Sequence, residues 1–143
     1  MKKVYEIVCD LAHLDEFAQS ILDELKEEGI ILLRGNLASG KTAFVKAFAK
    51  LLAIQEPISS PTFSILHEYD DKLFHYDIYQ CGIDGFLKSG LMEKLDCKGY
   101  HLIEWAEADF EALLRQFGIA YSTIDIEIEL SKRKYKVEIN AHA

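Results

Sequence analysis

Apolar residues recur along the N-terminal part of the chain with the period of an amphipathic helix. After Asp10, a candidate N-cap, apolar residues follow at spacings of three and four, and Gly29 is a candidate helix end. These apolar positions are Leu14, Phe17, Ala18, Ile21, Leu22 and Leu25. A second helix of the same rhythm is predicted over residues 44–52. The β-branched and aromatic run from Val4 to Val8 predicts a strand before the first helix.

Other stretches have the patterns of strands. Continuous apolar runs at Ile30 to Leu33 and Tyr100 to Trp105 predict strands that are covered on both faces. Residues 62–69 and 72–79 predict two more strands, joined by a hairpin turn at Asp70 and Asp71. Strands that alternate with helices indicate an α/β fold.

The C-terminal half contains weaker helix signals and a clear hairpin. Leucines at spacing four predict a helix over residues 86–95, although Gly90 inside it costs about 1 kcal/mol relative to alanine. A short helix is predicted from Phe110 to Phe117. Apolar and charged residues alternate over residues 124–130 and 135–139, which predicts a half-exposed antiparallel hairpin. We expect one domain spanning residues 1–143.

The segment GNLASGKT joins the predicted strand at Ile30 to Leu33 with the helix at 44–52. It matches Gly-x-x-x-x-Gly-Lys-Thr, the phosphate-binding loop (P-loop) pattern, in which glycines let backbone N–H groups turn toward phosphate oxygens. Lys41 is predicted to reach the β- and γ-phosphates, and the Thr42 hydroxyl to coordinate Mg²⁺. The predicted nucleotide-binding residues are Gly35, Asn36, Leu37, Ala38, Ser39, Gly40, Lys41, Thr42 and Ala43.

A P-loop site also needs an acidic side chain at the end of a neighbouring strand, and two are available. Asp77 and Glu104 each end a predicted strand, and ligands of open α/β sheets bind at the carboxyl ends of strands. Such an acid holds Mg²⁺, directly or through water, or orients the attacking water. The alternative for each is a solvated rim group or a helix cap.

Thr62 and Trp105 each have two interpretations, and a third residue, His75, has weak support. Thr62, in SSPTF, either places its hydroxyl near the γ-phosphate or metal, or belongs to a strand that starts after Pro61. Trp105 either stacks on a base or packs in the core. His75 and Asp77 would share one face of a strand, but a His/Asp pair without a nucleophile is weak evidence for a hydrolase.

Composition limits the partners and the compartment. The chain has 143 residues, is 50% hydrophobic and carries a formal charge of −8, with one compact basic cluster at Lys132 to Lys136. Nucleic-acid binding draws on clustered Lys and Arg, so we expect no contact with DNA and only indirect contact with tRNA. Cys9, Cys81 and Cys97 lack metal-site spacing and are interpreted as reduced thiols. We expect a cytoplasmic protein without a membrane segment.

In this order, the segments GNLASGKT, SPTF, HYDIYQ and IEWAE resemble the bacterial TsaE family, formerly YjeE. The resemblance implies a Mg²⁺-dependent ATPase that assists TsaB and TsaD in making threonylcarbamoyladenosine next to the tRNA anticodon. In that family the chemistry on RNA belongs to TsaD. The motif and the resemblance together predict a P-loop NTPase-like three-layer sandwich, with a central mixed sheet, antiparallel hairpins and flanking helices.

The resemblance also assigns roles to single residues. It implies phosphate and metal positions at Lys41 and Thr42, catalytic roles for Lys41, Asp77 and Thr62, and Mg²⁺ contact through Glu104. Arg133, in the predicted turn of the terminal hairpin, matches a Gly-Arg pair near the nucleotide, with Lys132 in place of the glycine. The positions that match family motifs are Lys41, Thr42, Thr62, Asp77, Glu104, Trp105 and Arg133.

The sequence departs from the family pattern at a few positions. Asn36 and Ala38 replace an acid and a glycine of the usual loop, and neither position supplies charge to the phosphates. Gln80 stands where the family has arginine, which puts a role of that arginine in doubt.

Two other functions use the same loop. A small P-loop kinase would transfer the γ-phosphoryl group to a hydroxyl, but the chain has no arginine-rich lid, since Arg34, Arg115 and Arg133 are its only arginines. A docking module that does not hydrolyse ATP would use the nucleotide to order the SPTF segment.

Overall fold

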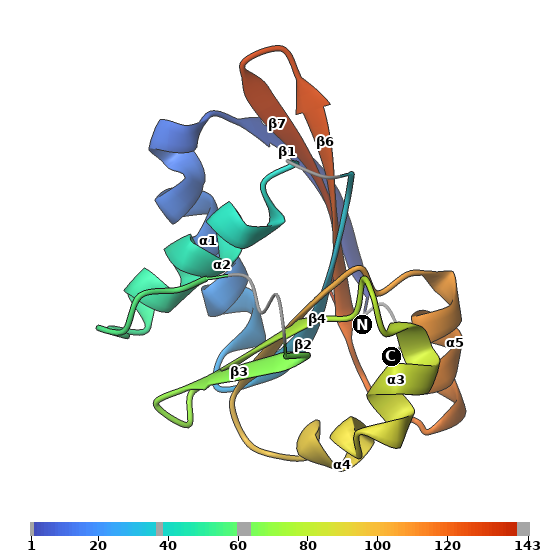
Figure 1. The fold of residues 1–143 in the computed structure, drawn as a ribbon. Helices are drawn as coiled ribbons and strands as arrows, with labels where there is room; N and C mark the ends of the chain where they lie inside the picture. The colour runs from blue at the N-terminus through green and yellow to red at the C-terminus, as the bar shows by residue number, and fades with distance from the viewer. Residues whose placement is uncertain (1, 37–38, 60–63, 140–143) are drawn as a thin grey trace.

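The computed structural model describes residues 2–36, 39–59 and 64–139 (Figure 1). The strands are β1 (Lys3–Cys9), β2 (Gly29–Arg34), β3 (Leu66–Tyr69), β4 (Leu73–Asp77), β5 (Tyr100–Glu104), β6 (Ser122–Glu129) and β7 (Lys132–Ile139). The helices are α1 (Leu14–Leu25), α2 (Lys41–Leu51), α3 (Gly82–Lys88), α4 (Leu91–Lys94) and α5 (Ala108–Gln116), with the 3-10 helix η1 (Leu11–His13) before α1. None of the described helices is long and apolar enough to cross a membrane.

All seven strands join one mixed sheet in the order β1-β7-β6-β2-β5-β4-β3. The central pairs β6·β2, β2·β5 and β5·β4 are parallel, and the outer pairs β1·β7, β7·β6 and β3·β4 are antiparallel. The carboxyl ends of β2, β4 and β5 therefore meet at one edge of the sheet. The predicted α/β sandwich with a mixed sheet and antiparallel hairpins is confirmed.

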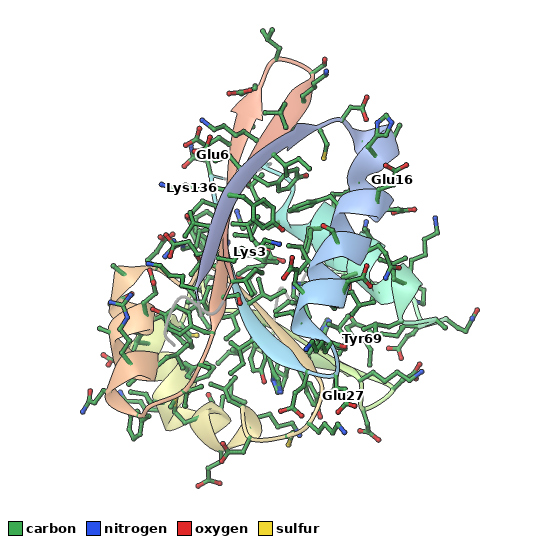
Figure 2. The ribbon with its side chains drawn as sticks, turned by 180° about the vertical axis from the view of Figure 1, so that it is seen from behind. Lys3, Glu6, Glu16, Glu27, Tyr69 and Lys136 are labelled. Atoms are coloured by element: carbon green, nitrogen blue, oxygen red, sulfur yellow. The ribbon has the colours of Figure 1, made fainter. Side chains whose placement is uncertain are left out.

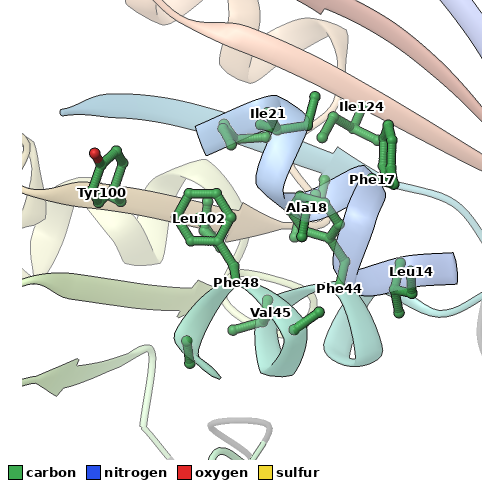
Figure 3. Packing of buried hydrophobic residues seen from close by; sticks show 14 of the residues in the cluster. Leu14, Phe17, Ala18, Ile21, Phe44, Val45, Phe48, Tyr100, Leu102 and Ile124 are labelled. Atoms are coloured by element: carbon green, nitrogen blue, oxygen red, sulfur yellow. The ribbon is translucent and has the colours of Figure 1, made fainter. Parts of the chain in front are cut away.

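One face of the sheet packs against α1 and α2 (Figure 3). The apolar stripe of α1 supplies Phe17 and Ile21, and α2 supplies Phe44 and Phe48. The rings of Phe17 and Phe44 lie 5.7 Å apart, centroid to centroid. Burying such side chains contributes roughly 1.5–3 kcal/mol each, so this layer anchors α2, the helix that follows the glycine-rich segment.

The opposite face packs against α3, α4 and α5, as Figure 1 shows. Ile31 and Leu33 of β2 point to the α1 side, whereas Ile30 and Leu32 point to this second cluster with Phe86 and Phe110. Both faces of β2 are thus covered, which explains its unbroken apolar sequence.

The outer strands carry charges on the face that α1 does not cover. Tyr5 of β1 packs against the cluster beside α1, so strand alternation directs Glu6 to the other face. Glu6 is in register with Lys136 of β7, and Lys136 with Asp125 of β6. Figure 2 shows Glu6 and Lys136 on the same side of the strands. Opposite charges on neighbouring strands stabilise a sheet face that is open to water.

Both predicted hairpins are present. Asp70 and Asp71 have φ of 55° and 53°, and they are the central residues of a turn between β3 and β4 in which the Lys72 N–H donates to the Tyr69 carbonyl at 2.9 Å. In the terminal hairpin, Ile124 and Ile126 are buried, but Ile128 is half exposed. The tip projects beyond α1 and α2 (Figure 1), so no helix covers it.

Two sequence predictions about helices were wrong in detail. The helix over residues 86–95 is two short helices, because Gly90 adopts φ of 73° and turns the chain between α3 and α4. The first helix ends at Leu25, with Lys26 at φ of 69°, and Gly29 begins β2 instead of ending the helix. Asp10 caps η1, where its carboxylate accepts a hydrogen bond from the His13 N–H.

Arg34 joins three elements at the carboxyl end of β2. Its Nε and Nη2 donate to the two carboxylate oxygens of Asp125 in β6, at 2.7 and 2.9 Å, and its Nη1 donates to Glu111 in α5. Burial alone would lower the pKa of Arg34, but these hydrogen bonds raise it above its ordinary value. Tyr121 also donates to Glu111. The network fixes the end of β2, from which the GNLASGKT segment starts.

Replacing Arg34 should therefore destabilise the fold. We expect Arg34→Leu to lower the free energy of unfolding by roughly 1–3 kcal/mol, because it leaves two partly buried carboxylates without their cation. Urea unfolding measures the change. Lys98→Leu, which removes a cation paired with Glu27 at 3.6 Å on the exposed surface, is the control and should change stability little. Equal losses in the two variants would contradict this role of Arg34.

Candidate functional site

A backbone hydrogen bond closes the segment between β2 and α2 into a loop. Gly40 is the N-cap of α2 with φ of 110°, and the Ser39 N–H donates to the Asn36 carbonyl at 3.0 Å. The first N–H groups of α2 therefore open toward this loop, where the helix dipole favours an anion. The predicted loop residues Leu37 and Ala38 lie outside the described residues.

Gly35 lies in a position that admits no side chain. A Cβ there would lie 2.6 Å from Ser39 Oγ and 2.7 Å from the backbone oxygen of Ile126 in β6. Ser39 is itself buried, and its Oγ has no hydrogen-bond partner among the described residues. The first glycine of the motif thus lets the loop approach β6 closely.

Lys41 lies folded onto the loop that precedes it. Its Nζ donates to the carbonyls of Gly35 and Asn36 at 2.7 and 3.0 Å, and lies 4.0 Å from the centroid of the Trp105 ring. The side chain is buried, and this burial lowers the pKa of Lys41, while Glu104 and nearby acids oppose the shift. A buried cation held by neutral groups is a strong partner for an anion.

Thr42 and Glu104 come together from two elements. The Thr42 hydroxyl, in the first turn of α2, donates to Glu104 Oε2 at 3.2 Å, and Glu104 ends β5 with only 3% of its surface exposed. Two oxygens that share an octahedral Mg²⁺ lie about 3 Å apart, so this pair fits the ion that the family implies. Among the described residues, no three His, Cys, Asp or Glu side chains form a metal cluster of their own. Mg²⁺ here would take its other oxygens from phosphate and water.

Asp77 lies on the neighbouring strand, in register with Glu104. Its Oδ1 accepts a hydrogen bond from the Tyr79 N–H at 2.9 Å, so one carboxylate oxygen holds the turn after β4. Its charge is one of those that raise the pKa of Lys41. Asp77 is thus part of the same acidic edge as Glu104, which accepts the hydrogen bond from Thr42.

Trp105 and Arg133 border the loop from two sides. Trp105 follows β5 with φ of 70°, and its ring contacts Tyr79 at 4.6 Å between centroids as well as the Lys41 ammonium. Arg133, in the terminal hairpin, donates from Nε to the Ser39 carbonyl at 2.9 Å. The structure therefore brings together residues that are 94 positions apart in the sequence.

A cleft of about 640 Å³ opens beside the loop. Gly35, Asn36 and Ser39 line one wall, and Trp105 and residues of β6 line the others. Ala43 lies in α2 and packs against the core beside α1, so only its backbone can serve the loop. Thr62 lies outside the described residues, and its predicted role stays a prediction.

Sequence reasoning named His75 only as half of a weak His/Asp pair and missed its contact with Glu104. His75 of β4 is fully buried, and its Nε2 lies 2.5 Å from Glu104 Oε2. The sequence offered one signal, its position two residues before Asp77 on a strand that ends at the site.

The sequence model of the family described as "Threonylcarbamoyl adenosine biosynthesis protein TsaE" matches residues 8–138. The chain belongs to the TsaE family. Two proteins named tRNA threonylcarbamoyladenosine biosynthesis protein TsaE are among its relatives. The one from Treponema pallidum is 41% identical over 92 residues, which are 62% of this chain and 68% of the relative. The one from Aquifex aeolicus is 36% identical over 102 residues, 66% of this chain and 70% of the relative.

A solved structure supports the same assignment. The crystal structure of YdiB from Bacillus subtilis superimposes with a TM-score of 0.71 and 25% sequence identity. The match covers 99% of this chain and 88% of that one, so the sheet and its flanking helices belong to the family architecture as a whole.

The close approach at Gly35 can be tested by stability alone. We expect Gly35→Ala to lower the free energy of unfolding by roughly 2–5 kcal/mol, for two reasons. The new Cβ would clash with the Ile126 carbonyl, and the φ of residue 35 is unfavourable for alanine. Gly118→Ala is the control, since its φ is also positive but nothing lies within 4 Å of a Cβ there, and it should cost only about 1–2 kcal/mol. Similar losses in thermal unfolding would contradict the close packing of the loop on β6.

Proposed function

We propose that this protein binds and hydrolyses Mg-ATP as an accessory in the threonylcarbamoyl modification of adenosine next to the tRNA anticodon. The proposal rests on one observation: Lys41, Thr42 and Glu104 lie close together at the carboxyl edge of the sheet. A cation, a hydroxyl and a carboxylate at the start of one helix match the needs of a triphosphate with its metal.

The chain's own groups would bind the phosphates in two ways. Backbone N–H groups of the loop and of the first turn of α2 would donate to phosphate oxygens. Lys41 would exchange its hydrogen bonds with Gly35 and Asn36 for bonds with the β- and γ-phosphates. Because the cation is already buried and close to this place, little side-chain ordering accompanies the exchange.

Thr42 and Glu104 would hold the metal, with Asp77 placed to orient water beside them. Mg²⁺, when bound, supplies charge that neutralises the β- and γ-phosphates during hydrolysis. Arg133 lies against the loop and adds a second positive charge at its rim. Thr62 remains proposed as a catalytic group on the strength of the family resemblance.

The pathway and the partners follow from the family. The named relatives are threonylcarbamoyladenosine biosynthesis proteins. A formal charge of −8 disfavours direct tRNA binding, which supports a partner complex of TsaB and TsaD as the part that carries the RNA. A cytoplasmic location accords with that work and is part of the proposal.

The two other functions would give different products in one assay. A kinase would move phosphate to an acceptor, and a docking module would bind ATP and release no phosphate. Arg34 is engaged with Asp125 and Glu111, and Arg115 lies near Glu111 and over the Tyr121 ring, so neither supplies a lid over the loop. Phosphate release with and without TsaB and TsaD separates the three functions.

The Lys41 ammonium should contribute most of the side-chain affinity for phosphate. We expect Lys41→Ala to weaken ATP binding at least about 10-fold, because a charge-assisted hydrogen bond contributes roughly 1.5–3 kcal/mol. Calorimetry measures the affinity, and emission from Trp105, the chain's only tryptophan and a neighbour of Lys41, reports binding independently. Lys46→Ala, an exposed lysine of the same helix, is the control and should bind normally. Normal binding by Lys41→Ala would refute the phosphate site.

The acidic edge should matter for turnover more than for nucleotide binding. We expect Glu104→Gln to reduce Mg²⁺-dependent phosphate release by about 100-fold or more, and Asp77→Asn to reduce it as well, with ATP affinity in a chelator unchanged. Glu107→Gln, an exposed acid whose charge also reaches Lys41, is the control. If both acid variants hydrolyse ATP at the normal rate, these acids have no part in the mechanism.

A further inference from the structure

The buried imidazole of His75 contacts the one carboxylate that also contacts Thr42. His75 Nε2 lies 2.5 Å from Glu104 Oε2, and the Thr42 hydroxyl lies 3.2 Å from the same oxygen. We propose that His75 is a positioning residue that holds Glu104 in the orientation for Mg²⁺. This inference rests on the proposed function and deepens it, since it adds a residue that acts on the metal through Glu104.

The direction of the hydrogen bond follows from the chemistry of its two atoms. A carboxylate oxygen only accepts, so the Nε2–H of His75 donates to Oε2. Glu104 and His75 are 3% and 0% exposed, and a buried carboxylate without a donor would be costly. Both contacts of Glu104 fall on Oε2, which fixes the rotation of the carboxylate and leaves Oε1 outside both bonds.

A second buried histidine shows what a purely structural role looks like. His101 of β5 uses both ring nitrogens, with Nδ1 at 2.7 Å from the Tyr76 hydroxyl and Nε2 at 2.8 Å from the Cys97 carbonyl. His75 Nδ1, although buried, has no hydrogen-bond partner in the described part of the chain. The hydrogen bonding of His75 is thus directed at Glu104 alone among those residues.

Three elements then determine the geometry of the metal ligands. The parallel register of β4 and β5 brings His75 and Glu104 to neighbouring strands, and α2 presents Thr42 to the same oxygen. A residue that orients a metal ligand typically changes metal affinity by about 10- to 100-fold when it is lost. His75 should therefore set how much Mg²⁺ strengthens nucleotide binding, without touching the nucleotide.

The test uses calorimetry to measure the affinity for a non-hydrolysable ATP analogue, once with saturating Mg²⁺ and once with a chelator. The ratio of the two affinities is the Mg²⁺ gain. We expect His75→Phe to reduce this gain by about 10-fold or more and to leave the affinity in chelator unchanged. His75→Gln, whose amide N–H can still reach Glu104, should recover the gain to within about threefold of the original protein. A merely structural histidine would not give this rescue.

His101→Phe is the matched control, because it makes the same change at a buried histidine of the neighbouring strand that has no contact with Glu104. It should keep the full Mg²⁺ gain. Should His75→Phe fail to fold, His75→Asn takes its place in the comparison with His75→Gln, because the asparagine amide is too short to reach Glu104. An unchanged gain in His75→Phe or in His75→Asn overturns the inference. An original protein that binds no nucleotide either with Mg²⁺ or in chelator overturns the proposed function, and this inference with it.

Discussion

The parallel pairing of β2 with β5 is the constraint on which the rest of the site depends. It places Leu33, two residues before the glycine-rich loop, in register with Glu104, so that a loop and a carboxylate from distant parts of the chain lie at the same edge of the sheet. Parallel strands of this kind are stable only when both faces are covered, and the two helical layers supply that cover. The fold and the site are thus consequences of one arrangement.

Burial gives the site its electrostatic character. Lys41, Glu104 and His75 all lie out of water, where each polar group needs a partner. The partners are mutual: Glu104 accepts from Thr42 and His75, and the charge of Glu104 also opposes the lowering of the Lys41 pKa by burial. Side chains that satisfy one another in this way are held in place before any ligand binds.

The terminal hairpin links the N-terminal strand to the loop. β7 pairs with β1 on one side and β6 on the other, and Arg133, near the start of β7, donates to the Ser39 carbonyl. At the same edge, Arg34 of β2 donates hydrogen bonds to Asp125 of β6 and to Glu111 of α5, and so links the three elements. The hairpin therefore joins the edge strand β1 to the centre of the sheet and also lines one wall of the cleft.

The sequence alone determined the elements whose pattern is local. Periodicity indicated α1, α2 and the two hairpins, and the glycine-lysine-threonine segment located the loop, because spacing and turn chemistry act over a few residues. Tertiary structure decided the rest. The exposed tip beyond Ile126 and the pairing of His75 with Glu104 depend on which elements lie beside one another. Strand order sets those neighbours, and a contact between residues 29 positions apart leaves no periodic trace in the sequence.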